Sequence, residues 1–127
     1  MSEKLVAQKL GLKPGKTLFV SHAPAPIANL LGATPDGAHV TETGKGPFPL
    51  ILVFAKNHAA MAKLLPQCKA KLESGGALWL AYAKGTSPKA TDINRDSIHD
   101  YVAGIGLDTV AQIAIDADWS ALRMKVV

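Results

Sequence analysis

One stretch of the sequence, residues 49–82, constrains the fold most, because it reads as a buried strand, a helix and a second buried strand. Residues 50–55 (LILVFA) are continuously apolar, as expected of a parallel strand covered on both faces. Residues 57–72 place apolar side chains at helical spacing, and residues 77–82 (ALWLAY) form the second apolar run. This order is a βαβ unit and predicts an α/β fold built on a parallel sheet. Ligands of such sheets bind beyond the carboxyl ends of the strands, so a site is expected there.

Further strands are predicted at residues 17–21, 110–115 and 121–127, with a weak one at 38–43. The weak strand is followed by a short loop, and six extended residues reach only about 20 Å. It must therefore be short, or lie irregularly at the edge of the sheet. The tight connection Asp116-Ala117-Asp118-Trp119 predicts an antiparallel hairpin between the last two strands. The expected fold is a three-layer, Rossmann-like sandwich with a mostly parallel sheet of about six strands and a C-terminal antiparallel hairpin.

Two predicted helices, one at residues 57–72 and one that begins near residue 94, have capping residues at their N-termini. Asn57 is the expected N-cap of the first, and Asp92 or Asn94 that of the second. Pro66 lacks an N–H, so a kink or two short helices are expected in the first. Its buried stripe is predicted from spacings of three and four, and comprises Met61, Leu64, Leu65, Cys68 and Leu72.

Composition narrows the class of protein. The 127 residues are 48% hydrophobic and 19% charged, which suits one domain spanning residues 1–127. The net charge is +4, but the basic residues are scattered, so nucleic-acid binding is not predicted. Cys68 is the only cysteine, which excludes an intrachain disulfide and a cysteine metal cluster. With no apolar run of membrane-spanning length and no signal-peptide pattern, a cytoplasmic protein is expected.

The order of elements, together with residues 72–79 (LESGGALW), resembles a shortened class I methyltransferase-like Rossmann fold. That resemblance implies the strand order 2-1-3-4-6-5. The whole chain also resembles a bacterial family of small uncharacterised proteins, a domain of unknown function, which implies no particular activity. The phrases that carry this second resemblance are residues 9–15, 23–24, 30–32, 46–48, 75–79, 89–96 and 119–122.

The sequence departs from the methyltransferase pattern after the first strand. Binders of S-adenosylmethionine (SAM) place a glycine-rich turn there, so that the backbone approaches the ligand closely. Residues 21–26 (SHAPAP) contain no glycine, and both prolines lack an N–H donor. Glu42, about 20 residues further on, is the one residue that resembles the acidic ribose ligand of dinucleotide sites. No bound cofactor is therefore expected.

The loops after the strands bring several polar residues to one edge of the predicted sheet. The segment from Lys84 to Asp92 offers lysines, hydroxyls and the N–H groups of the next helix, which suits an anion, although helix capping alone explains many of these residues. His22 and His58 are expected to meet there, but two histidines without a carboxylate or thiolate make a poor metal site. Neither has an identifiable nucleophile beside it, so no catalytic residue and no metal ligand is assigned. The candidate ligand-binding residues are His22, His58, Lys84, Lys89, Thr91, Asp92, Arg95, Asp118 and Trp119.

Two hypotheses follow. The first is a non-enzymatic binding or regulatory domain that has lost the cofactor turn. It would act through its strand-end loops or through an exposed sheet edge, on a protein partner or as a homodimer. The alternative is a small protein or enzyme that binds an anion or nucleotide through its strand-end loops, with a SAM-dependent methyltransferase as its enzymatic form. An anionic small molecule is the ligand expected under the alternative.

Overall fold

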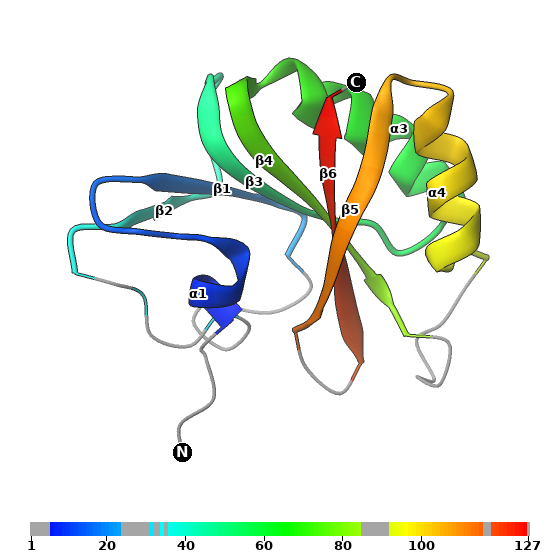
Figure 1. Ribbon diagram of the computed structural model, residues 1–127, viewed down its shortest axis with the longest axis horizontal. Coiled ribbons are helices and arrows are strands. Elements are labelled where there is room, and N and C mark those ends of the chain that lie inside the picture. The colour runs from blue at the N-terminus through cyan, green and yellow to red at the C-terminus, as the bar shows by residue number, and fades with distance from the viewer. Residues whose placement is uncertain are drawn as a thin grey trace.

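The computed structural model describes residues 6–23, 31, 34, 36–84, 92–115 and 118–126. Its strands are β1 (Thr17–Ser21), β2 (His39–Thr41), β3 (Phe48–Phe54), β4 (Leu72–Ala83), β5 (Leu107–Ala114) and β6 (Trp119–Val126). Its helices are α1 (Val6–Leu10), α3 (His58–Ala70) and α4 (Arg95–Ala103). Figure 1 shows these elements along the chain.

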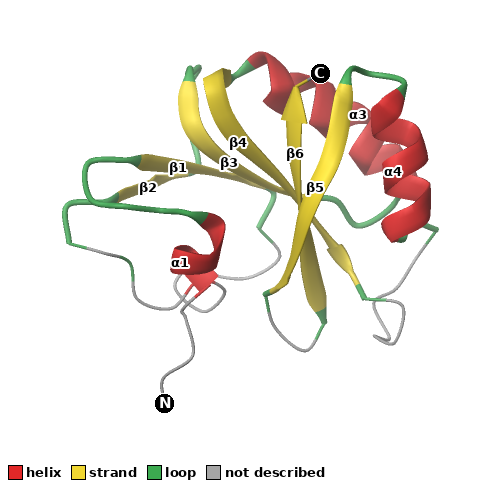
Figure 2. Cartoon of the chain, in the orientation of Figure 1, coloured by secondary structure: helices red, strands yellow, loops and turns green. Residues whose placement is uncertain are grey.

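The six strands form one sheet in the order β2-β1-β3-β4-β6-β5, as the resemblance implied. The pairs β1–β2, β1–β3 and β3–β4 are parallel, whereas β6 runs antiparallel to both of its neighbours. The predicted C-terminal hairpin is therefore confirmed, and the fold is the predicted Rossmann-like sandwich. Figure 2 shows α3 and α4 together at one side of the sheet and α1 away from them.

The weak strand is short and lies at the edge, as loop length required. In the register, Thr41 of β2 is level with Phe19, and Leu50 of β3 is level with Leu18. The chain must therefore step back by about three residues and across two strands, which is roughly 14 Å at standard strand spacings. Residues 42–47 can span that distance only because β2 ends after three residues.

Helix α3 begins where predicted, since the Asn57 side chain accepts a hydrogen bond of 2.8 Å from the N–H of Ala60. The expectation that Pro66 splits this segment into two short helices is wrong, because α3 runs unbroken through it. Proline deprives the carbonyl of Ala62 of its helical donor, and the Tyr101 hydroxyl donates to that carbonyl at 3.5 Å. The Tyr101 hydroxyl of α4 thus replaces, in part, the hydrogen-bond donor that Pro66 lacks.

Strand β4 begins earlier than the sequence indicated, at Leu72 instead of at Ala77. Leu72 pairs with Phe48, the register then shifts, and Ala77 pairs with Leu50. Gly76 makes this irregular crossing possible, because a Cβ there would lie 2.9 Å from the carbonyl oxygen of Pro49. Gly75 and Gly76, which precede the strand predicted at residues 77–82, therefore lie in a bulge inside β4.

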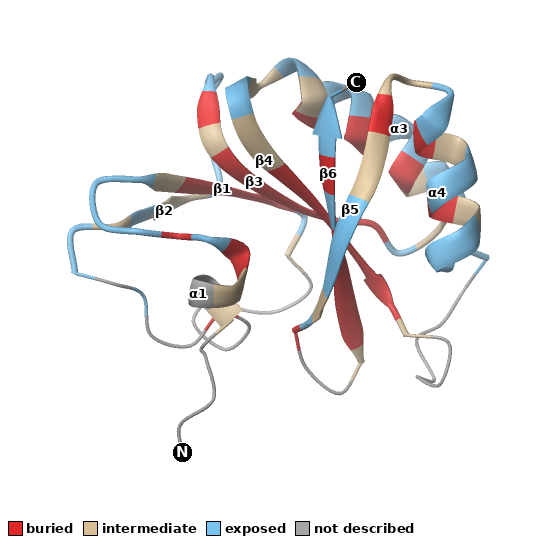
Figure 3. Cartoon of the chain, in the orientation of Figure 1, coloured by how far each residue is buried: buried red, intermediate tan, exposed pale blue. Residues whose placement is uncertain are grey.

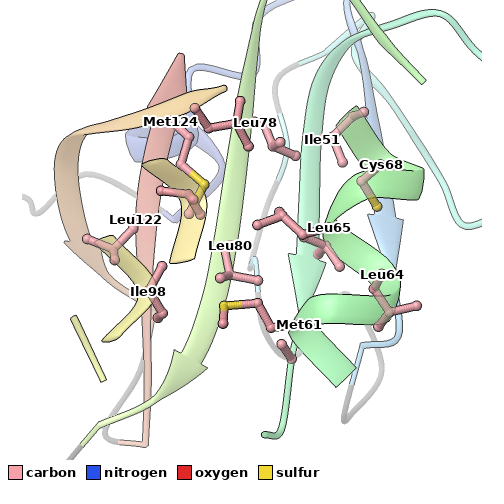
Figure 4. Packing of buried hydrophobic residues seen from close by; sticks show 14 of the residues in the cluster. Ile51, Met61, Leu64, Leu65, Cys68, Leu78, Leu80, Ile98, Leu122 and Met124 are labelled. Carbon is pink, nitrogen blue, oxygen red and sulfur yellow. The ribbon is translucent and has the colours of Figure 1, made fainter. Parts of the chain in front are cut away.

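The core lies on both faces of the sheet, and β3 is buried on each (Figure 3). The face covered by α3 and α4, called the helix face here, holds Leu78 and Leu80 of β4. Met61 and Leu65 of α3 lie beside Leu80 in the close view of this packing (Figure 4). The opposite face, called the N-terminal face, packs β1, β3 and β4 against Leu10, Leu12 and Leu31.

Candidate functional site

The carboxyl ends of the parallel strands meet at one edge of the sheet. Ser21 of β1 pairs with Val53 of β3, and Phe54 pairs with Ala81 of β4. Strand β6 starts at the same edge, where Trp119 pairs with Ala83. The side chains that follow each strand are therefore brought together, which is where ligands of open α/β sheets bind.

The first hollow at this edge, called the strand-end cavity, has a volume of about 340 Å³. Its walls come from the ends of β1 and β3, the first turns of α3 and the start of β6. Phe54 and Trp119 contact each other edge to face, with ring centroids 5.4 Å apart, so the cavity has an aromatic wall. The cavity is lined by His22, Ala23, Phe54, Lys56, Ala60, Leu64 and Trp119.

His22, the first residue after β1, has an unusual backbone. Its φ is +59°, in the left-handed region that side chains other than glycine rarely adopt. The Ser21 hydroxyl lies 2.7 Å from His22 Nδ1, so a hydrogen bond holds the ring and leaves Nε2 for a ligand. A histidine thus adopts, directly after β1, a backbone conformation that usually requires glycine.

Cys68 lies on the helix face, where the Ser21 hydroxyl also interacts with its thiol. Burial raises the pKa of the Cys68 thiol, while the nearby Lys71 ammonium opposes the increase. The thiol is therefore neutral at physiological pH and behaves as a buried apolar group, not as a nucleophile.

The second hollow, called the cationic hollow, lies on the helix face at the ends of β4, β5 and β6, beside the start of α4. It has a volume of about 710 Å³. The Gln112 side chain donates a hydrogen bond of 3.2 Å to the Tyr82 hydroxyl within it. Burial raises the pKa of the Tyr82 phenol, and the Arg95 guanidinium opposes that increase. The residues that line the cationic hollow include Tyr82, Lys84, Arg95, Gln112, Ala114 and Ser120.

The predicted site residues divide between these hollows. His22 and Trp119 line the strand-end cavity, whereas Lys84 and Arg95 line the cationic hollow. Lys89 and Thr91 lie outside the described residues. Asp118 is half-buried, and its backbone carbonyl accepts a hydrogen bond of 2.7 Å from the N–H of Lys84.

His58 and Asp92 contact each other instead of the cavity. The N–H of His58 donates a 2.7 Å hydrogen bond to the Asp92 carboxylate, which therefore caps α3 from a distant loop. The His58 ring packs edge to face on Tyr101 of α4, with centroids 5.5 Å apart. The expected meeting of His22 and His58 is not observed, because His58 is held against α4 and is absent from the cavity wall.

Several lining residues escaped the sequence-based prediction. Phe54 ends an apolar strand, and Leu64 belongs to the apolar stripe of α3, so both read as core. Gln112 and Ser120 belong to no sequence pattern that predicts a binding site. Their positions follow only from the pairing of β5 with β6, in which Gln112 is opposite Leu122 and Ser120 is opposite Ala114.

Neither a metal site nor a membrane-spanning helix is found in the described part of the chain. No group of three or more histidine, cysteine or acidic residues there could hold a metal ion. The described helices also fall short of the length and apolar character needed to cross a bilayer.

Comparison with known families and curated proteins gives no match. No protein-family model matches the sequence, and no curated protein matches it. The resemblance to a family of small uncharacterised bacterial proteins therefore stays a prediction.

Solved structures of methyltransferases are similar to the chain. A SAM-dependent methyltransferase from Aquifex aeolicus has a TM-score of 0.64 at 13% identity, covering 96% of this chain and 88% of that one. The glycopeptide N-methyltransferase MtfA complexed with sinefungin has a TM-score of 0.60 at 12% identity, covering 95% and 83%. A ribosomal protein L11 methylase from Lactobacillus delbrueckii subsp. bulgaricus has a TM-score of 0.59 at 12% identity, covering 94% and 73%.

These findings correct the first functional hypothesis. The non-enzymatic interpretation depended on the missing glycine turn, but the fold is that of SAM-dependent methyltransferases. His22, directly after β1, also adopts a left-handed backbone without being glycine. The comparisons favour the alternative hypothesis, and they show that the chain has the class I methyltransferase fold.

Proposed function

We propose that this domain binds SAM in the strand-end cavity and transfers its methyl group to a small-molecule acceptor. The observation that carries the proposal is the position of this cavity, beyond the carboxyl ends of β1 and β3 in a sheet with the methyltransferase strand order. The structural neighbours named above support it.

The residues of the cavity fit such a ligand. Its volume of about 340 Å³ lies within the range of roughly 300–1,000 Å³ that is usual for small-molecule sites. Phe54, Leu64 and Trp119 offer an apolar and aromatic surface suited to a nucleobase. Glu42 is exposed directly after β2, and its position resembles that of the acidic ribose ligand of dinucleotide sites.

The prolines near the turn limit the affinity. Pro24 and Pro26 have no N–H to donate, whereas a glycine-rich turn offers a donor at each position. A hydrogen bond contributes about 1 kcal/mol, so each missing donor lowers the affinity about fivefold. We therefore expect SAM to bind more weakly here than to a glycine-rich turn.

His22 is the residue placed to move a proton. When bound, SAM supplies an electrophilic methyl group on a sulfonium. Nε2 of His22, which lines the cavity, would accept the proton that the acceptor gives up on methylation. Ser21 holds Nδ1 and so orients the ring for this role.

Binding is tested by titrating SAM and S-adenosylhomocysteine calorimetrically against the wild type, Ala60→Phe and Ala59→Phe. Ala60 lines the cavity, whereas Ala59 is its exposed neighbour on the same helix. We expect Ala60→Phe to weaken binding at least about tenfold, since the ring fills the cavity, and Ala59→Phe to have no effect. Failure of the wild type to bind either compound would contradict the proposal.

Methyl transfer is tested with methyl-labelled SAM and a panel of small phenols. Measured at saturating SAM, His22→Gln should lower the rate of product formation by about 10²–10⁴, the usual contribution of a general base. If SAM binds but no acceptor is methylated, the function is reduced to ligand binding.

A cytoplasmic location, a single domain over residues 1–127 and a homodimer remain proposals. The lone Cys68 supports the first, because the chain makes no use of disulfides.

A further inference from the structure

The floor of the cationic hollow is a row of neighbouring residues on three strands. Tyr82 of β4 pairs with Ser120 of β6, which pairs with Ala114 of β5. Directly paired residues point to the same face, so all three side chains lie on the helix face. Tyr82 and Ser120 are each only 5% exposed, so their hydroxyls are set into a largely buried surface.

Helix α4 begins beside this row without covering it. Ile98 and Val102 are its buried residues and pack on the helix face one turn or more beyond Arg95. The first turn of α4 therefore forms a wall of the hollow, and the exposed Ala114 provides an apolar patch on its floor.

Two cations, Lys84 and Arg95, line the hollow, and none of the described lining residues is acidic. Neither cation forms an ion pair with another described residue. The Asp92 carboxylate already accepts a hydrogen bond from the N–H of His58. The lining of the hollow is therefore positively charged.

The hydroxyls on the floor are available as donors. Tyr82 accepts its hydrogen bond from Gln112, so the phenolic hydrogen is left to point elsewhere. Among the described residues, the Ser120 side chain has no hydrogen-bond partner. Donors and cations surround a small apolar patch, an arrangement that favours an anion attached to an apolar group.

We propose that the cationic hollow binds a small organic oxyanion, a carboxylate or a phosphate monoester with an apolar body. Arg95 and Lys84 bind the oxyanion, the Tyr82 and Ser120 hydroxyls donate to it, and the apolar body rests on Ala114. This site is separate from the strand-end cavity, although Trp119 and Ser120, adjacent in β6, belong to one hollow each.

Calorimetric titration with phenyl phosphate, benzoate and benzyl alcohol tests the site. We expect one or both anions to bind with a dissociation constant near or below about 1 mM and the neutral alcohol not to bind. The stronger of the two anions identifies the headgroup. Inorganic phosphate binding as tightly as phenyl phosphate would overturn the role of the apolar patch.

Three variants locate the binding. Arg95→Gln should weaken binding of the preferred anion about tenfold or more, because a charge-assisted hydrogen bond is lost. Tyr82→Phe should weaken it by a smaller factor, about fivefold. Lys63→Gln, an exposed position on α3, is the matched charge control and should bind as the wild type does. Binding of neither anion, or equal binding by Arg95→Gln and the wild type, would overturn the proposal.

These experiments test the two sites separately, because each variant should lose one ligand and keep the other. Ala60→Phe should keep phenyl phosphate binding and lose SAM, and Arg95→Gln should do the reverse. Loss of SAM binding alone counts against the proposed function, and loss of anion binding alone counts against the oxyanion site. Circular dichroism of each variant distinguishes either result from misfolding.

Discussion

The two faces of the sheet are covered in different ways. On the helix face, α3 and α4 bury β3, β4 and β6 beneath interlocking aliphatic side chains. On the N-terminal face, the cover over β1, β3 and β4 includes the short helix α1 and Leu12. One hydrogen bond, of 3.0 Å from the Trp79 indole N–H to the carbonyl of Leu10, joins that cover to the middle of the sheet.

Strand β6 shows where the second cover ends. Leu122 and Met124 are buried on the helix face, while Arg123 and Lys125, which alternate with them, are exposed on the other. The described cover of the helix face is two helices, whereas that of the N-terminal face is α1, Leu12 and Leu31, held by packing and by the Trp79 hydrogen bond. Substitutions on the two faces should therefore have different consequences.

The largest effect is expected from Leu80→Ala on the helix face. Leu80 is fully buried, and its truncation leaves a cavity that the packed helices cannot close, so the free energy of unfolding should fall by about 2–5 kcal/mol. Urea denaturation measures this. Val110→Ala, at a position 47% exposed on edge strand β5, is the control and should change stability by less than about 0.5 kcal/mol. Similar losses in both variants would remove the distinction between core and edge.

A smaller and more local effect is expected from Trp79→Phe on the N-terminal face. This variant removes the indole N–H and leaves the Leu10 carbonyl without its donor, at a cost of about 1–3 kcal/mol. Hydrogen exchange should show faster exchange in residues 6–12 than in α3. Uniform loss of protection across both regions would mean that the N-terminal cover is integral to the sheet.

The smallest effect is a decline in stability at alkaline pH, and it arises on the helix face. The pKa values of Cys68 and Tyr82 are both raised in the folded protein by burial, so folding favours their neutral forms. Their contribution is complete below the pKa of the unfolded groups, about 8.5 for cysteine and 10 for tyrosine, and is lost as the pH rises above it. The urea midpoint should therefore fall between about pH 8 and pH 10, with a shallower slope for Cys68→Ala. Identical slopes would show that the thiol ionises as readily in the fold as outside it.

Much of the sheet could be predicted from the sequence, because its strands have local signatures. The strand at residues 17–21 was placed correctly, and the Asn57 cap and the C-terminal hairpin are confirmed. Two features escaped the sequence because they depend on distant residues. Helix α3 continues through Pro66, where the Tyr101 hydroxyl donates to the carbonyl of Ala62. Strand β4 begins at Leu72, and Gly76 lies close to the Pro49 carbonyl.

The candidate site could be predicted only in part. Residues that follow strands were brought to the expected edge, since parallel strands end together. The division of these residues between two hollows depends on β6, which lies between β4 and β5. Its successive residues Trp119 and Ser120 point to opposite faces of the sheet. His58 was misplaced because its contacts with Asp92 and Tyr101 come from α4 and the segment before it.

The two tryptophans of the chain have separate surroundings, and this gives the protein a built-in optical readout. Trp79 is buried beneath the N-terminal cover, whereas Trp119 forms a wall of the strand-end cavity. In Trp79→Phe the remaining indole emission comes from Trp119 alone, so quenching or a spectral shift on adding a nucleoside reports occupancy of that cavity without any attached dye. In Trp119→Phe the emission reports instead whether the amino-terminal segment is docked.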